Sequence, residues 1–330
     1  MEEGEYGFCR TRRNIGGQVH TLVYGDISAV AVHPIEHKPL FHFHPGSRVL
    51  TVSTWSCNLE CGWCFRKYLS RGADNVGHGQ FILPEAAVGL VKRHECQGIA
   101  ISFNEPTMLF EWCLDTFPLL KQEGYYTCFV TNGYMTPEAL RSLAERGLDA
   151  AKIDIKGDAE AVRQHCGADV EKVWRNTVEA KELGLWVEVV TVVVPQVNDS
   201  EESLRGIASR IKAELGEDTP WHVNAYLPRD DYAFRAYGQA TPLDTLLQAR
   251  EIGLKEGLNY VYSGGYPGAY QNTLCPSCQE LLIERHGFGF DFFDYRMGPD
   301  KRCPNCGREV PIVGEPYFAR ETGKTFQWNP

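Results

Sequence analysis

The sequence predicts an α/β fold, a partial (β/α)6 barrel of the TIM type followed by a small cysteine-rich module. Apolar β-branched runs alternate with helical patterns about six times through the middle of the chain. Polar or charged residues follow each run, and four cysteines lie in two pairs near the C-terminus. We expect a β-rich extension over 1–47, the barrel over 48–265 and the module over 266–330.

Composition narrows the class of protein. The 330 residues are 43% hydrophobic and 12% aromatic, which is enough for a large core. A formal net charge of -10 argues against nucleic acid as the main partner, because phosphate contacts need clustered lysine and arginine. The chain has no apolar run of about eighteen residues, and its first residues do not resemble a secretory signal. We expect a soluble, cytoplasmic protein without a membrane partner.

The barrel elements follow one another in a regular order. The expected strands are RVLTVST, GIAISF, YTCFVT, LDAAKIDIK, LWVEVVTVVV and WHVNAYLP. Helical patterns such as PEAAVGLVKRHE, TPEALRSLAERG and TPLDTLLQAREIGLKEG follow them. Strand–helix units joined by right-handed crossovers give a parallel sheet. Barrels of this type carry their working residues at the C-terminal strand ends.

The predicted strand ends are rich in acids, amides and cations. Turn formation and helix capping would explain any one of them, but six on one barrel face favour a shared site. These residues are Ser102, Asn104, Glu105, Thr131, Asn132, Asp154, Lys156, Glu188, Thr191, His222 and Asn224.

The first strand leads into CNLECGWC, which contains Cys57, Cys61 and Cys64. Four thiolates would complete a tetrahedral zinc site or a fully protein-ligated [4Fe-4S] cluster. Three thiolates leave one iron of a cubane without a protein ligand. The loop therefore predicts an open cluster at which a substrate or cofactor binds.

This C-x3-C-x2-C spacing, with Trp63 before the last cysteine, resembles the signature of radical S-adenosylmethionine (radical SAM) enzymes. The resemblance implies that S-adenosylmethionine chelates the open iron of the [4Fe-4S] cluster. It also implies reductive cleavage to methionine and a 5′-deoxyadenosyl radical, which abstracts hydrogen from a substrate.

The same resemblance implies roles for the strand-end residues. Glu105 would receive the methionine ammonium in a GGE-like motif whose two glycines are here Phe103 and Asn104. Lys156 would contact the carboxylate. The remaining assignments place Thr131 and Asn132 beside the methionyl group, Asp154 on the lysine's strand, Val194 at the adenine and His222 near the ribose.

A narrower resemblance extends over most of the chain. HPIEHKPLFHFHPGS, FNEPTMLFE, DAAKIDIKG, VVVPQVNDS and NTLCPSCQELLIERHGF are similar to the radical enzyme of the AmmeMemoRadiSam group, a relative of pyruvate formate-lyase activating enzyme. This implies hydrogen abstraction of the kind that activates glycyl-radical proteins. A protein substrate and a small-molecule substrate both stay open.

The basic residues Arg66, Lys67 and Arg71 follow the three-cysteine loop. They suit an acidic one-electron donor such as flavodoxin or ferredoxin, or they offset the charge of the thiolates. His33, His37, His42 and His44 are interpreted as surface and hairpin residues rather than metal ligands.

The C-terminal cysteines form two Cys-x2-Cys pairs, Cys275/Cys278 and Cys303/Cys306. Four ligands without a vacancy predict a zinc-ribbon-like module, with a rubredoxin-like iron as the alternative. The segment GFGFDFFDY between the pairs is expected to pack within it.

Two other functions remain open. An iron–sulfur electron-transfer or binding protein would close its cluster with a fourth cysteine such as Cys9. A radical SAM methyltransferase would release S-adenosylhomocysteine instead of 5′-deoxyadenosine.

Overall fold

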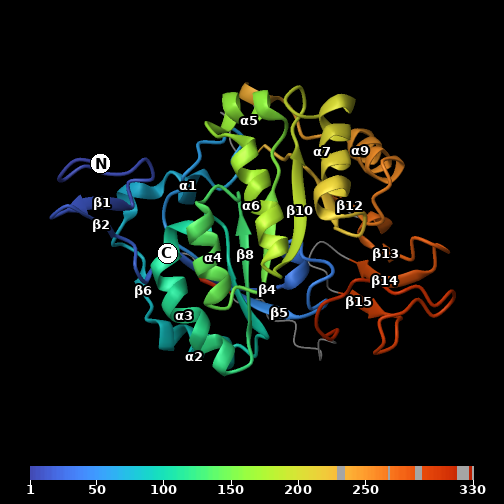
Figure 1. The fold of residues 1–330 in the computed structure, drawn as a ribbon, viewed down its shortest axis with the longest axis horizontal. Coiled ribbons are helices and arrows are strands. Elements are labelled where there is room, and N and C mark those ends of the chain that lie inside the picture. The colour runs from blue at the N-terminus through green and yellow to red at the C-terminus, as the bar shows by residue number, and fades with distance from the viewer. Residues whose placement is uncertain (229–234, 267, 287–291, 318–326, 329–330) are drawn as a thin grey trace.

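A computed structural model describes residues 1–330 except 229–234, 267, 287–291, 318–326 and 329–330. Its centre is a nine-stranded sheet with the order β12-β11-β10-β9-β8-β7-β5-β4-β16 (Figure 1). The parallel strands are β5 (Arg48–Ser53), β7 (Gly98–Ile101), β8 (Tyr126–Thr131), β9 (Ala150–Asp154), β10 (Trp186–Val193), β11 (Trp221–Ala225) and β12 (Val261–Gly264).

All six predicted strands form, and the parallel α/β fold is confirmed. The structure adds a seventh parallel strand, β12, because the run LNYVYSG pairs with β11. On the other side, β4 (Ala29–Pro34) runs antiparallel to β5, and β16 (Gln327–Trp328) pairs with β4. Part of the expected N-terminal extension thus belongs to the main sheet.

Helices connect the parallel strands and cover the sheet, as α4 and α6 do in the view of Figure 1. The side chains of Thr136, Asp158, Asp169 and Ser200 accept backbone amides at four helix starts and so define where those helices begin. The longer helices are α2 (Pro84–Arg93), α3 (Phe110–Gln122), α4 (Pro137–Glu145), α5 (Ala159–Cys166), α6 (Val170–Glu182), α7 (Glu201–Arg210) and α9 (Leu243–Lys255).

Short elements complete the described chain. Helical turns are η1 (Ile35–His37), α1 (Lys67–Ser70), η2 (Gly72–Asn75), η3 (Pro106–Leu109), the π-turn η4 (Ile211–Leu215) and η5 (Ala269–Gln271). Small sheets pair β1 (Arg12–Ile15) with β2 (Gln18–Thr21) and β3 (Asp26–Ile27) with β6 (Gln80–Phe81). None of the helices in the described ranges is both long and apolar enough to cross a bilayer.

Apolar side chains from the sheet and the helices form one continuous core. Trp112 and Phe117 of α3 are fully buried in it, and the Trp112 indole donates to the carbonyl of Ile82 at 2.8 Å. Burial of large aromatic side chains of this kind supplies much of the free energy of folding. Apolar side chains thus pack between the sheet and its helices, whereas polar side chains lie at the C-terminal ends of the strands.

The C-terminal module contains a separate antiparallel sheet of β13 (Thr273–Leu274), β14 (Leu281–His286) and β15 (Phe292–Tyr295). Arg285 of β14 is fully buried and donates to the carbonyl of Phe41 at 2.7 Å. This arginine therefore fastens the module to the segment that follows β4. Residues 287–291 of GFGFDFFDY lie outside the described residues.

Candidate functional site

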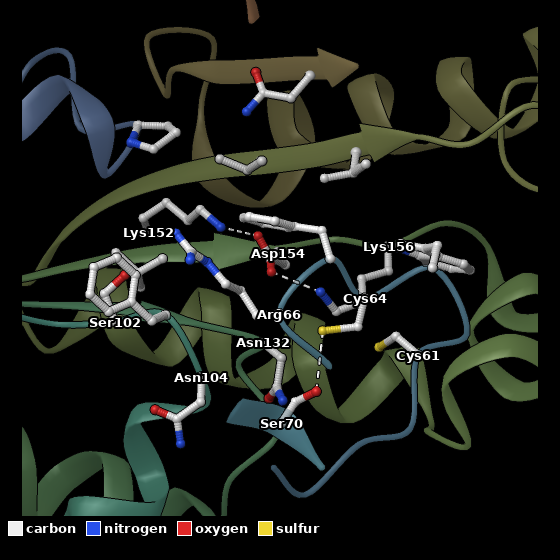
Figure 2. Close-up of a pocket in the computed structure, with 18 of the residues that line it drawn as sticks. Cys61, Cys64, Arg66, Ser70, Ser102, Asn104, Asn132, Lys152, Asp154 and Lys156 are labelled. Atoms are coloured by element: carbon white, nitrogen blue, oxygen red, sulfur yellow. Dashed lines mark hydrogen bonds and ion pairs between the residues drawn. The ribbon is translucent and has the colours of Figure 1, made fainter. Parts of the chain in front are cut away.

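A cavity of about 420 Å³ opens at the C-terminal ends of the parallel strands (Figure 2). Residues following β5, β7, β8, β9, β11 and β12 all contribute to its wall, so the sheet curves around it. The wall contains the three predicted cluster thiols, and also Asn104, Glu105, Asn132, Asp154 and Lys156. The prediction that strand ends converge on one site is therefore supported by their positions.

The loop after β5 presents its thiols to this cavity. The backbone amide of Leu59 lies 3.4 Å from the Cys57 sulfur, and the side-chain amide nitrogen of Asn132 lies 3.7 Å from it. Cys64 Sγ lies 3.3 Å from Ser70 Oγ (Figure 2). Burial, with the neighbouring Glu105, raises the pKa of Cys57 to about 12, so a metal must displace that proton to bind.

The C-terminal end of α5 holds the loop in place. The amides of Glu60 and Gly62 donate to the carbonyls of Cys166 and His165 at 3.2 and 3.0 Å. A hydrogen bond from the Cys166 thiol lowers the pKa of Cys61 to about 7. Tyr237 lies so close to Gly62 that a side chain at position 62 would overlap its hydroxyl. An alanine at position 62 would therefore have to displace the Tyr237 side chain.

Glu105 joins the ends of β7 and β8. Its Oε1 accepts from the hydroxyls of Thr107 and Thr131 at 2.6 and 2.7 Å, while Oε2 accepts from the amide of Asn132 at 2.9 Å. Burial raises the pKa of this carboxyl, although these donors oppose that effect. Thr131 therefore acts on the cavity through Glu105, whereas Asn132 lines the cavity itself.

A charged triad lies on one side of the cavity. Asp154 forms ion pairs with Lys152 and with Lys156, the second at 2.7 Å (Figure 2). Burial acts to raise the pKa of Asp154, but the two ammonium groups outweigh it and lower the pKa to about 2. Burial likewise disfavours the charged form of Lys156, yet Asp154 and nearby thiols raise the pKa of that amine. Strand β9 ends at Asp154, so Lys156 follows the strand instead of lying within it.

The side chain of Asn104 forms hydrogen bonds to the backbone of the segment before Cys57. Its side-chain amide donates to the carbonyl of Ser56 at 2.8 Å, and its oxygen accepts from the amide of Thr54 at 3.2 Å. These bonds tie the end of β7 to the backbone just before Cys57. Although Asn104 lines the cavity, its polar atoms position the three-cysteine loop.

His222 and Val194 lie away from the cavity wall. The His222 ring is buried and contacts Glu188 at 2.7 Å, and that carboxylate also accepts the amides of Phe41 and His42. Two residues further along β11, Asn224 lines the cavity. Val194 is buried, while Val190 and Val192 of β10 line the cavity in its place.

The interpretation of His42 as a surface residue is wrong. Its ring is fully buried, 2.6 Å from the Tyr262 hydroxyl and 2.9 Å from the carbonyl of Pro311. Arg66 was expected to belong to a basic surface that binds an electron donor, but the structure places it in the wall of the cavity. No motif in the sequence points to Lys38, which also lines the cavity and comes from the segment before β5.

The four C-terminal cysteines form a separate centre. Their sulfurs all lie within 4.8 Å of one another, with Cys275–Cys306 and Cys278–Cys303 separations of 3.5 Å. Across the described ranges, no other set of three or more such ligand atoms is gathered this closely. The thiols of the three-cysteine loop are therefore not gathered around one point as the C-terminal thiols are.

Known proteins are similar to this chain in sequence. Residues 52–206 match the family model of the radical SAM superfamily. An uncharacterized protein of Methanocaldococcus jannaschii is 38% identical over 314 residues, which cover 95% of this chain and 92% of that protein. A putative glycyl-radical enzyme activating enzyme of the same organism is 26% identical, covering 62% of this chain and 77% of that protein.

Similarity of fold extends further than similarity of sequence. The structure of Streptococcus suis SuiB bound to S-adenosylmethionine has a TM-score of 0.52 at 15% identity. The match covers 66% of this chain and 52% of SuiB. At this identity the comparison supports the fold alone.

Proposed function

Because the chain belongs to the radical SAM superfamily, we propose that Cys57, Cys61 and Cys64 hold a [4Fe-4S] cluster and that the protein cleaves S-adenosylmethionine reductively for hydrogen abstraction. One observation carries the proposal: the three thiols share a cavity with a carboxylate, Glu105, and an ammonium, Lys156. These are the groups that recognise the two charged ends of an amino acid. A set of three thiols, one fewer than a fully protein-ligated cubane needs, also fits a cluster with one open iron.

The chain's own residues bind and orient the cosubstrate. Glu105 Oε2 accepts one hydrogen bond from the described residues, so lone pairs stay available for the methionine ammonium. Lys156 carries a stabilised positive charge for the carboxylate. When bound, the cluster supplies the electron that breaks a carbon–sulfur bond and releases the 5′-deoxyadenosyl radical. The barrel wall, including Val130, Val190 and Val192, excludes water from the reaction.

The electron donor and the second metal complete the proposal. Arg71 is exposed next to the three-cysteine loop, where it suits an acidic flavodoxin or ferredoxin. The close set of four C-terminal thiols suits zinc, with iron as the alternative that metal analysis separates. An activase-like role, in which a protein is the substrate, is supported by the name of the glycyl-radical relative.

The test is anaerobic reconstitution with iron and sulfide, reduction with dithionite and chromatography after adding S-adenosylmethionine. We expect 5′-deoxyadenosine from the wild type and none from Cys57→Ala. S-adenosylhomocysteine as the product would instead indicate a methyltransferase. A fully loaded cluster without either product would favour an electron-transfer protein and contradict the proposal.

A further inference from the structure

Lys38 reaches the cavity from the end of the barrel opposite the three-cysteine loop. Strand β4 runs antiparallel to β5, and its last residue, Pro34, pairs with Arg48 at the start of β5. The turn η1 and Lys38 therefore begin at the N-terminal end of the parallel strands. The lysine side chain is 3% exposed, lines the cavity and extends inward to Phe103, just past the end of β7.

The acids of the cavity do not neutralise this lysine. Asp154 is already bridged by Lys152 and Lys156, and Glu105 accepts from Thr107, Thr131 and Asn132. Among the described residues, no carboxylate oxygen lies within 4.0 Å of the Lys38 amine. Its polar contact is the ring nitrogen Nδ1 of His33 at 3.3 Å. A buried ammonium without a counter-charge is costly unless a ligand supplies one.

A second cation, Arg66, lies against the same Phe103 ring as Lys38. The Lys38 amine lies 4.9 Å from the ring centroid, and the guanidinium of Arg66 lies 4.7 Å from it. Figure 2 shows the Arg66 side chain extending into the cavity. Phe103 has a φ of +71°, a strained conformation for an aromatic residue. Strain of this kind persists where the surroundings hold a functional group in position.

We propose that Lys38 and Arg66, beside the Phe103 ring, form an anion subsite that binds a carboxylate or phosphate group of the radical enzyme's substrate. This inference rests on the proposed function and adds the chemical class of the substrate to it. S-adenosylmethionine does not need the subsite, because Lys156 is available for its carboxylate. Arginine and lysine together recognise either anion through charge-assisted hydrogen bonds.

Burial and the neighbouring Arg66 also prepare the lysine for an anionic ligand. Burial lowers the pKa of Lys38 to about 7, with the Cys128 thiol opposing this effect and Arg66 adding to it. His33, which faces the same amine, has its pKa lowered to about 3 by burial and is neutral. Binding of an anion would therefore restore the full positive charge of Lys38.

The test uses the full-length, iron-loaded protein saturated with S-adenosylmethionine under anaerobic conditions. Calorimetry measures the binding of two probes, acetate and inorganic phosphate, to the wild type and to Lys38→Met. We expect saturable one-to-one binding to the wild type, weakened at least tenfold in Lys38→Met. Preference for acetate would identify a carboxylate substrate, and preference for phosphate a phosphorylated one. Lys92→Met removes the same charge from an exposed site and should bind as the wild type does.

Several results would overturn the subsite. These are the absence of saturable binding of either probe to the wild type, and unchanged binding to Lys38→Met. A matching loss of S-adenosylmethionine affinity in Lys38→Met would show that the bound group is the cosubstrate's own carboxylate, which also overturns it. If Lys38→Met does not fold, Arg66→Gln carries the same prediction. Anion binding to a protein that makes no 5′-deoxyadenosine would sustain the subsite and reject the proposed function.

Discussion

The two cysteine centres present the same potential ligand atom in contrasting surroundings. The four C-terminal sulfurs lie within 4.8 Å of one another beside a small sheet. The three sulfurs of the loop after β5 instead line a cavity together with Asp154, Lys156 and Glu105. A complete, compact set of thiols suits a structural ion, whereas an incomplete set facing charged side chains leaves room for a reactant.

The comparison teaches that cysteine spacing alone does not separate the two kinds of site. Both centres contain a Cys-x2-Cys pair. The surroundings differ, because the loop thiols are reached by strand ends from across the barrel, while the C-terminal thiols are held by their own short turns. In one such turn, the amide of Gln279 donates to the carbonyl of Cys275 at 2.8 Å.

The largest effect is expected from Cys57→Ala. Two thiolates hold a cubane poorly, so iron should fall from about four atoms per chain to nearly none at this site. The C-terminal metal should remain, because its ligands are separate. Iron and zinc analysis of the same sample measures both. Loss of both metals together would contradict the proposal that the two centres bind metal independently.

Cys303→Ser is the reciprocal change and is expected to act on stability. Zinc binding in small modules contributes about 10–16 kcal/mol of apparent free energy, which is available for folding. We expect the variant to lose zinc and hydrogen-exchange protection over 273–285, and to keep iron at the loop. Retention of zinc would show that Cys303 is not a ligand.

Asp154→Asn tests the charges that distinguish the open centre. It leaves Lys152 and Lys156 partly buried without their shared counter-ion, so the free energy of unfolding should fall by about 3–5 kcal/mol. Asp149→Asn is the matched control, because its partner Lys121 is 40% exposed and the expected loss is below about 1 kcal/mol. Equal losses in a denaturant titration would contradict the special role of the triad.

The same carboxylate predicts a pH dependence. Its pKa is lowered from 3.8 to about 2, so its stabilising contribution is complete above pH 4 and is lost as the pH falls towards 2. The shift corresponds to about 2 kcal/mol. The stability difference between wild type and Asp154→Asn should therefore narrow across this range. A difference that stays constant from pH 5 to pH 2 would refute this assignment.

The smallest effect is expected from Gly62→Ala. The added methyl group must displace the Tyr237 hydroxyl, and overpacking of this size costs about 1 kcal/mol. Tyr237→Ala should relieve most of that cost, which a double-mutant cycle of unfolding free energies measures. Gly307→Ala, in the C-terminal centre, is limited by a φ of +75° instead, so Tyr237→Ala should not rescue it.

The sequence predicts the local features of this molecule well. Alternating strands and helices are encoded in short-range periodicity, so the parallel sheet and the cavity position of Glu105 and Lys156 could be expected. The three-cysteine and four-cysteine sets are similarly local in the chain. The three-cysteine loop meets residues of the other strands simply because the C-terminal ends of the parallel strands lie at one edge of the sheet.

Other features depend on packing between distant segments. Strand ends predict that a residue lies near the cavity, but they do not give its side-chain partner. The pairing of His222 with Glu188, and the hydrogen bond from Asn104 to the backbone near Cys57, could therefore not be predicted from the sequence. Lys38 was missed because it enters from the opposite end of the barrel, after an antiparallel strand that belongs to no strand–helix unit.

The most direct test of the contrast between the two centres is an electron paramagnetic resonance spectrum of the reduced, reconstituted protein before and after S-adenosylmethionine is added. An open iron in the loop centre predicts a changed spectrum, and it predicts that Cys303→Ser shows the same change. A spectrum unaffected by S-adenosylmethionine, from a cluster with about four irons, would mean that the loop centre is closed.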